Sequence, residues 1–571
     1  MENKIEIAKI NIENGKLYIK IKGFLCSTKD AKIRLTVLFR NGEQNRRFPL
    51  EADSFYSEEE KGSFFIGKER INLSDVFYLK EGETLLEQTK VEVEAFNGME
   101  RLLFTETGIC IPKELFISQK PKKSIIFSCY RVISAIICIF LLPFFIVDGM
   151  FAVKGYKKLD TGEHKEFGLR GVLLHANVTT KKLCGFSYSL REVKTKYLKR
   201  CYDYYKKKPI LENHVLLLSE RLLEENSNMA LIKEELSKNS NIVLTEFIDT
   251  TTINKLKFSQ IRESAKKMAQ AHCILLEDFY PQLHGLSIRP ETKVVQLWHA
   301  CGSFKTFGFS RLRKPGGPKE QSKNHRNYDY AFVSGSKMVP IYSEAFGIPE
   351  QNVLPLGVPR TDIFFQQGYK EKMQQKLFQK YPQLQGKKII LFAPTFRGAG
   401  NKTAYYPTDK INWNNFFEQA PEDYFVILKN HPFVKNKFSY DKKWENRILD
   451  LTGKDNINDL LFVTNILVTD YSSSVFEATL LHIPMIFYVF DKEEYLENRD
   501  IYYDFDTFVP GEQVKTQEHF IEVVKGIIDG DYSQKEEINE KYKWFQNEFL
   551  DALSGTSTNS IAQLIEKIVE G

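Results

Sequence analysis

The sequence predicts an α/β protein with two parallel sheets, preceded by a small antiparallel β-sandwich and a short membrane-interface segment. Three observations predict this fold. Two series of short apolar strands alternate with helical patterns, the N-terminal region alternates apolar and polar residues, and one uncharged run separates the two regions. At 571 residues the chain is too long for a single hydrophobic core, so several folding units are expected.

Residues 1–115 are predicted to form the β-sandwich. Period-two alternation occurs at 5–10, 16–21, 32–38 and 91–95, and Asn-Gly pairs at 14–15, 41–42 and 97–98 separate or flank these runs. Asn-Gly pairs between alternating runs are typical of tight hairpin turns. No pattern in this region is typical of catalysis, so we predict an accessory domain.

Residues 116–164 are predicted to associate with a membrane. The run from Val132 to Val147 contains no charged residue, Pro143 interrupts it, and lysines flank it on both sides. The run is shorter than the roughly 20 residues that a spanning helix needs. Basic residues on both flanks favour a helix or hairpin that lies in the surface of an anionic leaflet. A buried core helix is the alternative interpretation.

The rest of the chain is predicted to form two halves with a cleft between them. Apolar strands at 215–218, 242–245, 273–276, 294–297 and 330–333 form the first series, and strands at 388–392, 425–428, 466–469 and 485–488 form the second. Continuous apolar strands between helices are typical of parallel sheets covered on both faces. We predict Rossmann-like domains at 165–362 and at 363–571, the second ending in amphipathic helices.

The overall charge and the cysteines exclude several classes of protein. The net charge of +6 is small for this size, and the basic residues are widely spread, so a general nucleic-acid binder is not indicated. The eight cysteines contain no Cys-x-x-Cys pair and no zinc-like spacing, which is typical of reduced thiols in the cytosol. The first residues lack an apolar signal region, so secretion is not expected.

The stretch from Asn465 to Glu477 is predicted to bind an anion. A β-branched apolar run ends at Asp470, the hydroxyl-rich turn Ser472–Ser474 follows, and a helix-like run carries Glu477 in its first turn. Free N–H groups and the positive end of a helix stabilise a diphosphate at such a junction, and the hydroxyls can cap the helix or donate to phosphate oxygens. The Glu477 carboxylate can accept from ribose hydroxyls. An ordinary capped helix is the alternative interpretation.

Three other strand ends carry polar or ionic residues. His299 follows the strand at 294–297, Thr395 and Arg397 follow the strand at 388–392, and Lys429 and His431 follow the strand at 425–428. A histidine with a pKa near 6.5 at the crevice edge of an α/β sheet can act as a general base, although a lone histidine is more often structural. These charges suit a diphosphate ligand and the transfer of a phosphoryl group.

A basic loop follows the His299 motif. Six basic residues lie in the loop 311–326 around a Pro-Gly-Gly-Pro turn. The loop is either a solvated charged surface or a guide for a polyanionic acceptor. Farther on, Asp504-Phe505-Asp506 resembles the Asp-x-Asp of metal-dependent glycosyltransferases, but it follows no core strand, so we assign no metal and no cofactor.

Five motifs in this order resemble those of the CDP-glycerol glycerophosphotransferase family, the teichoic-acid primases and polymerases of Gram-positive bacteria. The motifs are Trp298-His299 and the segments 355–362, 393–397, 429–432 and 469–474. The resemblance covers about residues 210–510 well and residues 165–210 weakly. It implies a GT-B-like fold and a peripheral membrane enzyme at the cytoplasmic face of the cell membrane. Such a transferase moves a polyol phosphate from CDP-glycerol or CDP-ribitol to a lipid-linked polyanionic acceptor and releases CMP.

The resemblance also implies roles for individual residues. His299 and His431 would be the catalytic imidazoles. The CDP-polyol site would draw on four of the motifs and on two residues near motifs, Ser303 and Glu477. Its residues would be Ser303, Arg360, Pro394, Thr395, Arg397, Lys429, Asp470, Ser472, Ser473 and Glu477. Basic residues near His299 would guide the acceptor: Lys305, Arg311, Arg313 and Lys314. Residues 300–302 read Ala-Cys-Gly where glycerol-type members show Gly-Thr-Pro, which leaves the polyol open between glycerol and ribitol.

Two functions from other classes stay open at this point. A GT-B glycosyltransferase of cell-surface polymer synthesis would use a nucleotide sugar and release UDP. A non-catalytic scaffold at an anionic membrane surface would bind a nucleotide or a polymer without turnover. The nucleotide that is released separates these functions from polyol phosphate transfer.

Overall fold

The computed structural model describes residues 2–29, 31–98, 100–104, 108–117, 190–398, 403–528 and 536–571, together with residues 147 and 530. The predicted membrane-associating segment lies outside the described residues, except for residues 116, 117 and 147. The chain divides into two compact units, one of residues 1–116, 210–248 and 271–571, and the other of residues 117–209 and 249–270. In the described part of the chain, no helix has the length and apolar character needed to cross a membrane.

Two antiparallel sheets form the N-terminal part of the larger unit. The first has the order β1 (Lys4–Glu13), β2 (Lys16–Cys26), β6 (Gly62–Asn72), β5 (Ala52–Ser57). The second has the order β4 (Gln44–Leu50), β3 (Arg34–Asn41), β7 (Gln88–Phe96), β8 (Arg101–Phe104), and β9 (Cys110–Pro112) also pairs with β7. Asn14 and Gly15, both with positive φ, make the tight turn between β1 and β2.

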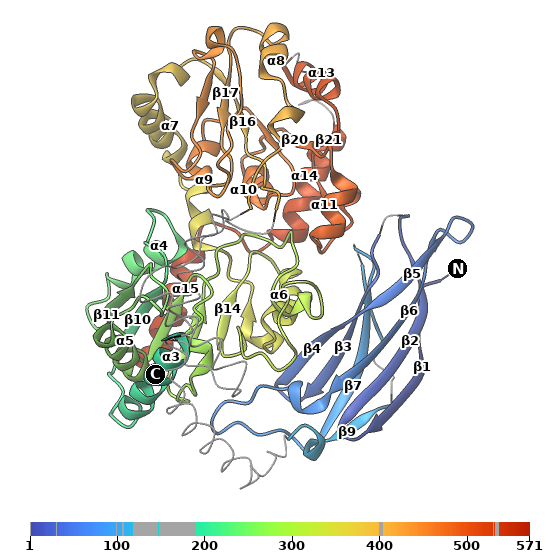
Figure 1. Ribbon diagram of the computed structural model, residues 1–571, viewed down its shortest axis with the longest axis vertical. Helices are drawn as coiled ribbons and strands as arrows, with labels where there is room; N and C mark the ends of the chain where they lie inside the picture. The colour runs from blue at the N-terminus through green and yellow to red at the C-terminus, as the bar shows by residue number, and fades with distance from the viewer. Residues whose placement is uncertain are drawn as a thin grey trace. The chain divides into compact units, whose positions relative to one another are not determined.

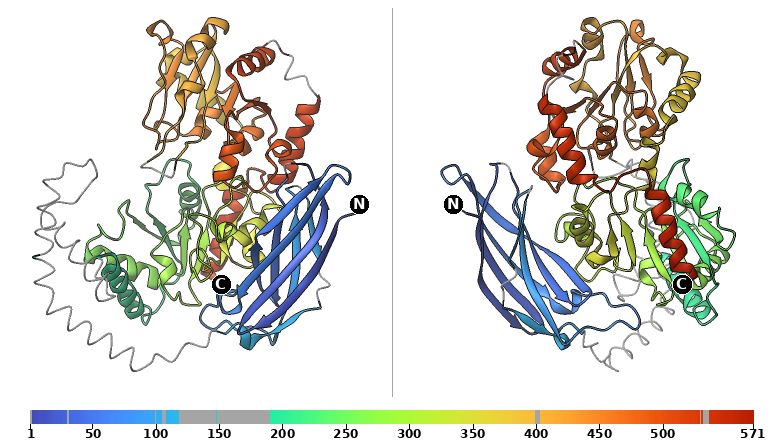
Figure 2. Two further views of the ribbon diagram at one scale, coloured as in Figure 1. Left: turned by 45° about the vertical axis from the view of Figure 1, so that its right-hand side comes forward. Right: turned by 180° about the vertical axis from the view of Figure 1, so that it is seen from behind.

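One hydrophobic cluster contains residues of both antiparallel sheets, which are drawn in blue in Figure 2. Leu17 and Ile19 of β2 and Val37 of β3 belong to it, as period-two alternation requires for one buried face. Phe309 and Leu312, far along the chain, belong to the same cluster. The N-terminal sheets therefore bury side chains of the loop that follows His299.

The first parallel sheet has the order β11 (Val243–Ile248), β10 (His214–Ser219), β12 (Cys273–Leu276), β13 (Lys293–Gln296), β14 (Tyr330–Phe332), β15 (Val353–Leu354). The helices α4 (Asn228–Leu236) and α6 (Met338–Phe346) belong to the same half of the chain. Every residue of β10 and β12 is buried, as expected for strands covered on both faces.

The last helix, α15 (Ser557–Glu570), packs on this first sheet although the second sheet precedes it in the chain. Ile561 and Ile565 of α15 share a hydrophobic cluster with Val215 and Leu217 of β10. Figures 1 and 2 show this red helix beside the green elements of the first sheet. The predicted boundary at residue 362 groups α15 with the second half, because an amphipathic pattern predicts a helix but not the sheet that it covers.

The second parallel sheet has the order β18 (Ile448–Asp450), β17 (Tyr424–Leu428), β16 (Lys388–Phe392), β19 (Ile466–Thr469), β20 (Met485–Tyr488), β21 (Glu512–Val514). Its helices are α7 (Tyr369–Lys380), α8 (Trp413–Gln419), α9 (Ile457–Leu461), α10 (Ser474–Leu480), α11 (Lys492–Asn498), α12 (Phe505–Phe508), α13 (Gln517–Ile528) and α14 (Glu536–Phe549). In Figure 1, α8 and α13 lie side by side, and Phe416 stacks on Phe520 with 5.6 Å between ring centroids.

The smaller unit contains two described helices, α3 (Leu190–Tyr205) and α5 (Phe258–Gln270), which pack on each other. The buried Lys194 of α3 donates hydrogen bonds to the carbonyl oxygens of Asn254 and Leu256, at 2.7 and 2.6 Å. A buried ammonium group needs such partners to offset its desolvation.

The predicted α/β fold with parallel sheets is confirmed. The nine strands predicted for the parallel sheets correspond to β10–β14, β16, β17, β19 and β20. In the antiparallel sheets the sequence predicted β1, β2, β3 and β7 but missed β4, β5, β6, β8 and β9. In the parallel sheets the strands that the sequence did not predict, β15, β18 and β21, lie at sheet edges and have two or three residues. Segments of this length are too short to carry a periodic pattern.

Candidate active site

Loops of four of the five motifs meet at one cavity of about 400 Å³, which we call the two-histidine cavity. β17, β16 and β19 are neighbours in the second sheet, so their carboxyl ends place three motif loops at one edge. The loop 298–307 follows β13 of the first sheet. Seven predicted site residues line the cavity: His299, Ser303, Lys305, Thr395, His431, Ser472 and Ser473.

His299 is hydrogen-bonded to a carboxylate that the sequence did not predict. Its Nδ1 lies 2.6 Å from Oδ1 of Asp278, and Oδ2 of Asp278 lies 3.1 Å from Nε of Arg221. Burial would raise the pKa of Asp278, but the hydrogen bond and charge of His299, with the charge of Arg221, lower it below its ordinary value. An ionised Asp278 holds the proton of a neutral His299 on Nδ1 and leaves a lone pair on Nε2, which a general base requires.

The backbone next to His299 is held in an unusual conformation. Trp298 has a φ of 58°, which few non-glycine residues adopt. Oε1 of Gln296 accepts from the N–H of Trp298 at 2.8 Å, and Nδ2 of Asn228 donates to the Trp298 carbonyl at 2.7 Å. Oδ1 of Asn228 also accepts from the backbone N–H of Arg360 at 2.8 Å. These bonds tie the His299 loop to the segment that leads into the second half.

His431 has the opposite hydrogen-bonding character. Its Nδ1 accepts from the backbone N–H of Phe433 at 3.2 Å, so the neutral ring carries its proton on Nε2 and can donate it to a hydrogen bond. Burial, followed by the charges of Lys305 and Arg221, lowers the pKa of His431. His431 is therefore a neutral donor near pH 7, whereas His299 offers an acceptor.

Three serine side chains line the two-histidine cavity. Ser303 is 3% exposed, and its Oγ is buried without a hydrogen-bond partner among the described residues. Oγ of Ser472 lies 2.9 Å from Oγ of Ser474 and accepts from the N–H of Ser474 at 3.3 Å. Ser473 is the N-cap residue of α10, but its side chain makes no capping bond. A buried hydroxyl without a partner in a cavity wall suits a polar ligand.

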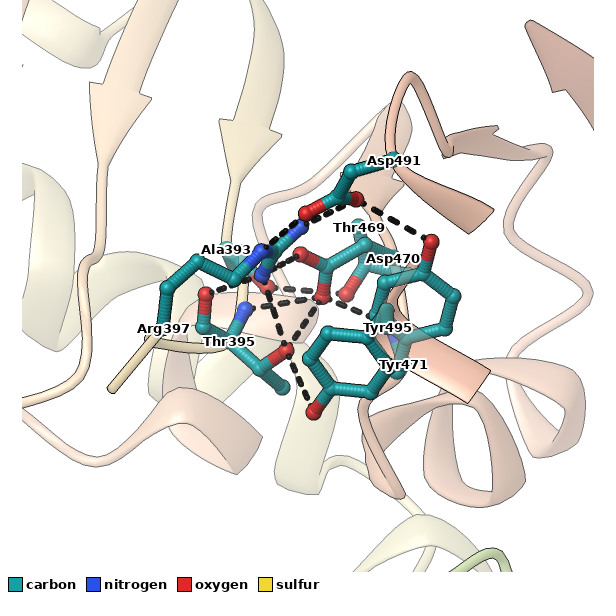
Figure 3. Close-up of polar contacts among 8 residues, drawn as sticks. All are labelled: Ala393, Thr395, Arg397, Thr469, Asp470, Tyr471, Asp491 and Tyr495. Atoms are coloured by element: carbon teal, nitrogen blue, oxygen red, sulfur yellow. Dashed lines mark hydrogen bonds and ion pairs between the residues drawn. The ribbon is translucent and has the colours of Figure 1, made fainter. Parts of the chain in front are cut away.

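Arg397 and Asp470 do not line the cavity, but they position Thr395, which does. Figure 3 shows the Arg397 guanidinium between the carboxylates of Asp470 and Asp491, at 2.8 and 2.6 Å. Asp470 also accepts from the N–H and Oγ1 of Thr395, at 2.8 and 2.9 Å. Burial would lower the pKa of Arg397, but the two aspartates raise it. The cluster therefore fixes Thr395 in the cavity wall, next to the buried Pro394.

Arg360 and Glu477 form a buried ion pair that joins η6 (Pro359–Phe364) to α10. The Glu477 side chain is 1% exposed, and neither residue lines the two-histidine cavity. Burial raises the pKa of Glu477 although Arg360 opposes the shift. Breaking a buried pair leaves an unpaired buried charge, so this contact stabilises the junction of the two parallel-sheet halves.

Lys429 is also engaged within the protein. Its Nζ donates to the carbonyl oxygens of Leu451 and Asp455, at 3.2 and 2.8 Å. Burial lowers the pKa of Lys429, although nearby carboxylates oppose the shift. These contacts hold the loop that carries His431 against the segment after β18.

Of the four predicted acceptor-guiding residues, Lys305 lines the two-histidine cavity. Arg311 donates to a backbone carbonyl oxygen within its own loop at 2.8 Å. Arg313 pairs with two glutamates, each at 2.6 Å, and Lys314 pairs with Asp500. The basic loop is therefore tied to its surroundings by ion pairs.

The Asp-x-Asp segment has structural contacts. Asp504 caps α12 by accepting from the N–H of Asp506 at 3.2 Å, and Asp506 pairs with Lys492 at 2.7 Å. Within the ranges that the structure describes, no group of three or more His, Cys, Asp or Glu side chains is arranged to hold a metal ion.

Two residues of this site were missed by the sequence reasoning. Asp278 lies just after the apolar strand β12, the same signal that singled out Asp470, so strand-end position was enough to find it. Asn228 gave no signal, because its role is a contact between a side chain and two backbone groups distant in sequence.

Comparison with known proteins identifies relatives of this chain. Residues 199–567 match the family model described as CDP-glycerol:poly(glycerophosphate) glycerophosphotransferase. The teichoic acid poly(ribitol-phosphate) polymerase of Bacillus spizizenii is 37% identical over 378 residues, which cover 66% of this chain and 60% of that protein. The teichoic acid ribitol-phosphate polymerase TarK of Staphylococcus aureus is 44% identical over 250 residues, which cover 44% of this chain and 49% of that protein. The chain thus spans about half the length of these curated relatives.

A solved structure shares the fold. The wall teichoic acid polymerase TagF is 19% identical and superposes with a TM-score of 0.54, covering 66% of this chain and 94% of that one.

Proposed function

Since this chain belongs to the CDP-glycerol:poly(glycerophosphate) glycerophosphotransferase family, we propose that it is a CDP-polyol phosphotransferase. It moves a polyol phosphate from a CDP-polyol to a teichoic-acid-type acceptor and releases CMP. The observation that carries the proposal is the pairing of two imidazoles of opposite character in one cavity. His299, held by Asp278, offers a proton acceptor, and His431 offers a donor.

His299 is the general base of the proposed reaction. A hydroxyl of the acceptor attacks the β-phosphorus of the CDP-polyol, and its proton passes to Nε2 of His299. The bond between the β-phosphorus and the bridging oxygen breaks, and CMP leaves with the electron pair of that bond. Asp278 stabilises the imidazolium that forms. Proton transfer by a positioned side chain contributes about 100- to 10,000-fold to a rate.

The opposite part of the site stabilises negative charge on the transferred group. The Nε2–H of His431, the ammonium group of Lys305 and the hydroxyls of Ser303 and Ser472 all belong to side chains that line the cavity. Donors fixed before the reaction stabilise a developing charge without reorganising. The buried Ser303 hydroxyl, which has no partner in the described part of the chain, gains one when a phosphate oxygen is bound.

The other predicted substrate-binding residues act through the cavity walls. Arg397 and Asp470 hold Thr395, and the pair of Arg360 and Glu477 holds η6 against α10. Lys429 and Pro394 belong to the same supporting layer. We assign these six residues to positioning of the CDP-polyol site.

Ribitol phosphate is the proposed polyol phosphate, supported by the names of the two curated relatives above. Residues 1–115 are an accessory β-sandwich, and residues 165–362 and 363–571 supply the two halves of a GT-B-like fold, except that α15 of the second stretch packs on the first sheet. The segment 116–164 holds the enzyme peripherally on the cytoplasmic side of the cell membrane, where a lipid-linked acceptor is available. The uncharged run with basic flanks supports this placement.

The experiment that tests this function measures nucleotide release. Purified full chain is incubated with a short soluble acceptor and with CDP-ribitol or CDP-glycerol. We expect CMP release, faster with CDP-ribitol, and a loss of about 100-fold or more in His299→Ala and in His431→Ala. His519→Ala, an exposed histidine of α13, is the matched control and should leave the rate unchanged. UDP release from a UDP-sugar, or CDP-polyol binding without turnover, would contradict the proposal.

A further inference from the structure

A second cavity, of about 450 Å³, lies where the N-terminal sheets contact the loop that follows the His299 motif. Lys32, Arg34 and Lys314 line it, and we call it the basic cavity after these three residues. Arg34 is the first residue of β3, Lys32 lies two residues before it, and Lys314 lies just after η4 (Gly308–Arg311). Among the residues that the structure describes, none lines both this cavity and the two-histidine cavity.

The three cations share one carboxylate. Asp500 lies 2.8 Å from Nη2 of Arg34 and 3.6 Å from Nζ of Lys32, and it also pairs with Lys314. One negative charge among three positive charges leaves an excess of positive charge. Burial and the charge of Arg34 lower the pKa of Lys314, although Asp500 opposes the shift. Nε of Arg34 is buried and has no hydrogen-bond partner among the residues that the structure describes.

Other charged groups of the wall reduce this excess without cancelling it. Glu344 adds a second carboxylate, which accepts hydrogen bonds from two hydroxyls of the wall, at 2.9 and 2.7 Å, so three cations face two carboxylates. Arg101 and Arg313, which also line the cavity, have glutamate partners of their own. Glu51 and Asp53 line the cavity too, but both are exposed, so water and salt screen their charge as they screen that of Lys32. The more buried Arg34 and Lys314 carry most of the positive charge.

Two chain segments that pair with each other, 304–306 and 500–502, separate the basic cavity from the two-histidine cavity. The N–H and Oγ1 of Thr306 donate to the carbonyl oxygen of Asp500, at 3.0 and 3.1 Å. The N–H of Tyr502 donates to the carbonyl oxygen of Phe304 at 3.1 Å, and the backbones of Lys305 and Ile501 form an antiparallel β-bridge. Phe304, Lys305 and Thr306 line the two-histidine cavity, whereas Asp500 and Tyr502 line the basic cavity.

We propose that the basic cavity binds phosphate groups of the polyanionic acceptor, which makes the N-terminal sheets an acceptor-binding module. The inference rests on the proposed function, because that function supplies an acceptor built of phosphodiesters. When the terminal hydroxyl of such a chain reaches His299, phosphates farther along the chain extend beyond the two-histidine cavity. Lys32, Arg34 and Lys314 offer these phosphates charge-assisted hydrogen bonds.

Two variants test the proposal. Lys32→Ala removes a charge whose side chain is 57% exposed, and Lys32→Ala with Lys314→Ala removes two. For a soluble poly(ribitol phosphate) oligomer, we expect the apparent KM to rise about threefold in the single variant and tenfold or more in the double variant. The KM for the CDP-polyol stays unchanged. The salt dependence of the oligomer KM becomes shallower, because fewer counterions are released on binding.

The matched control removes two lysines from the N-terminal sheets that do not line the basic cavity. Lys20 and Lys68 face each other in the register of β2 and β6, both are exposed, and neither lines the basic cavity. Lys20→Ala with Lys68→Ala should leave the KM for the oligomer unchanged. An equal rise in this control would show that general surface charge attracts the polymer and would overturn the proposal.

Oligomer binding without CDP-polyol separates this inference from the proposed function. Calorimetry with the poly(ribitol phosphate) oligomer should show weaker binding to the double variant than to the parent or the control, whether or not the protein turns over. Unchanged oligomer affinity in the double variant would overturn the inference and leave the proposed function standing. A rise in the KM for the CDP-polyol alone would place the nucleotide in the basic cavity and would also overturn it.

Discussion

Replacement of Asp278 by asparagine tests how His299 acts. The two side chains have nearly the same shape, so the cavity is retained while the charge 2.6 Å from Nδ1 of His299 is lost. The asparagine amide can donate to Nδ1, which favours the neutral ring with its proton on Nε2. That form cannot accept the proton of the acceptor hydroxyl.

The size of the effect follows from this geometry. The same replacement in a Ser-His-Asp triad lowers kcat by about 10⁴-fold. The Asp278 side chain is 17% exposed, so water screens part of its charge. We therefore expect kcat to fall by about 100- to 1,000-fold, which corresponds to about 3–4 kcal/mol of transition-state stabilisation.

The assay is CMP release at saturating acceptor, with kcat and the KM for CDP-polyol determined separately. The KM should change little, because Asp278 does not line the cavity. Arg221→Ala is the comparison variant. Arg221 contacts the other carboxylate oxygen at 3.1 Å but is 72% exposed, so its loss should cost about threefold or less. A kcat for Asp278→Asn within threefold of the parent would refute the assignment of His299 as the base.

Three further outcomes follow from contacts around the site. Burial lowers the pKa of His284 to about 4 and that of His325 to about 3. Below pH 6.5 these two imidazoles therefore bind protons in the unfolded chain before they do so in the folded protein. The free energy of unfolding then falls as the pH falls, by up to about 1.4 kcal/mol per pH unit for each histidine. His325→Asn, which tolerates the φ of 64° at that position, should flatten this slope in urea titrations between pH 4.5 and 7, and an unchanged slope would contradict the account. Gly302→Ala should destabilise the protein by about 2 kcal/mol or more, because φ is 63° and a Cβ would lie 2.3 Å from the buried Phe476 ring, whereas Gly285→Ala, with open space around it, should be nearly neutral in the same unfolding assay. Asn228→Ala should lower kcat by about 10- to 100-fold and keep the KM for CDP-polyol within threefold, because the Trp298 carbonyl and the Arg360 N–H lose their partner. Asn228→Asp keeps an acceptor for Arg360 but has no donor for Trp298, so it should lower kcat similarly. A parental kcat in Asn228→Asp would show that the Trp298 bond has no part in positioning His299.

The place of each motif loop was predictable from the sequence. Parallel strands end at one edge of a sheet, so an apolar run followed by a polar residue fixes where that residue lies. This reasoning placed His299, Thr395, His431 and Ser472 at strand ends, and all four line one cavity. The same reasoning would have found Asp278.

Which polar side chains stay free was not predictable. Arg397, Lys429 and Arg313 have charges that suit a phosphate, and each is engaged by groups of the protein. The partner of Arg397, Asp491, belongs to no motif and follows a different strand. Sequence position fixes where a side chain begins, but the groups it meets depend on packing between distant segments.

The contacts of the N-terminal sheets with the rest of the chain were also not predictable from the sequence. Alternation predicts four of their nine strands, and the ion pair of Arg34 with Asp500 joins residues far apart in the chain. A role for this region in binding the acceptor becomes visible only when these cations are seen beside the segment that borders the two-histidine cavity.

The transfer reaction itself is tested most directly by a doubly labelled donor. CDP-ribitol that carries one label in the cytidine and a second in the ribitol phosphate is incubated with the purified protein and a poly(ribitol phosphate) oligomer. The account predicts that the ribitol label enters the polymer while an equal amount of the cytidine label appears as CMP. Release of the cytidine label as CDP, or entry of both labels into the polymer together, would contradict it.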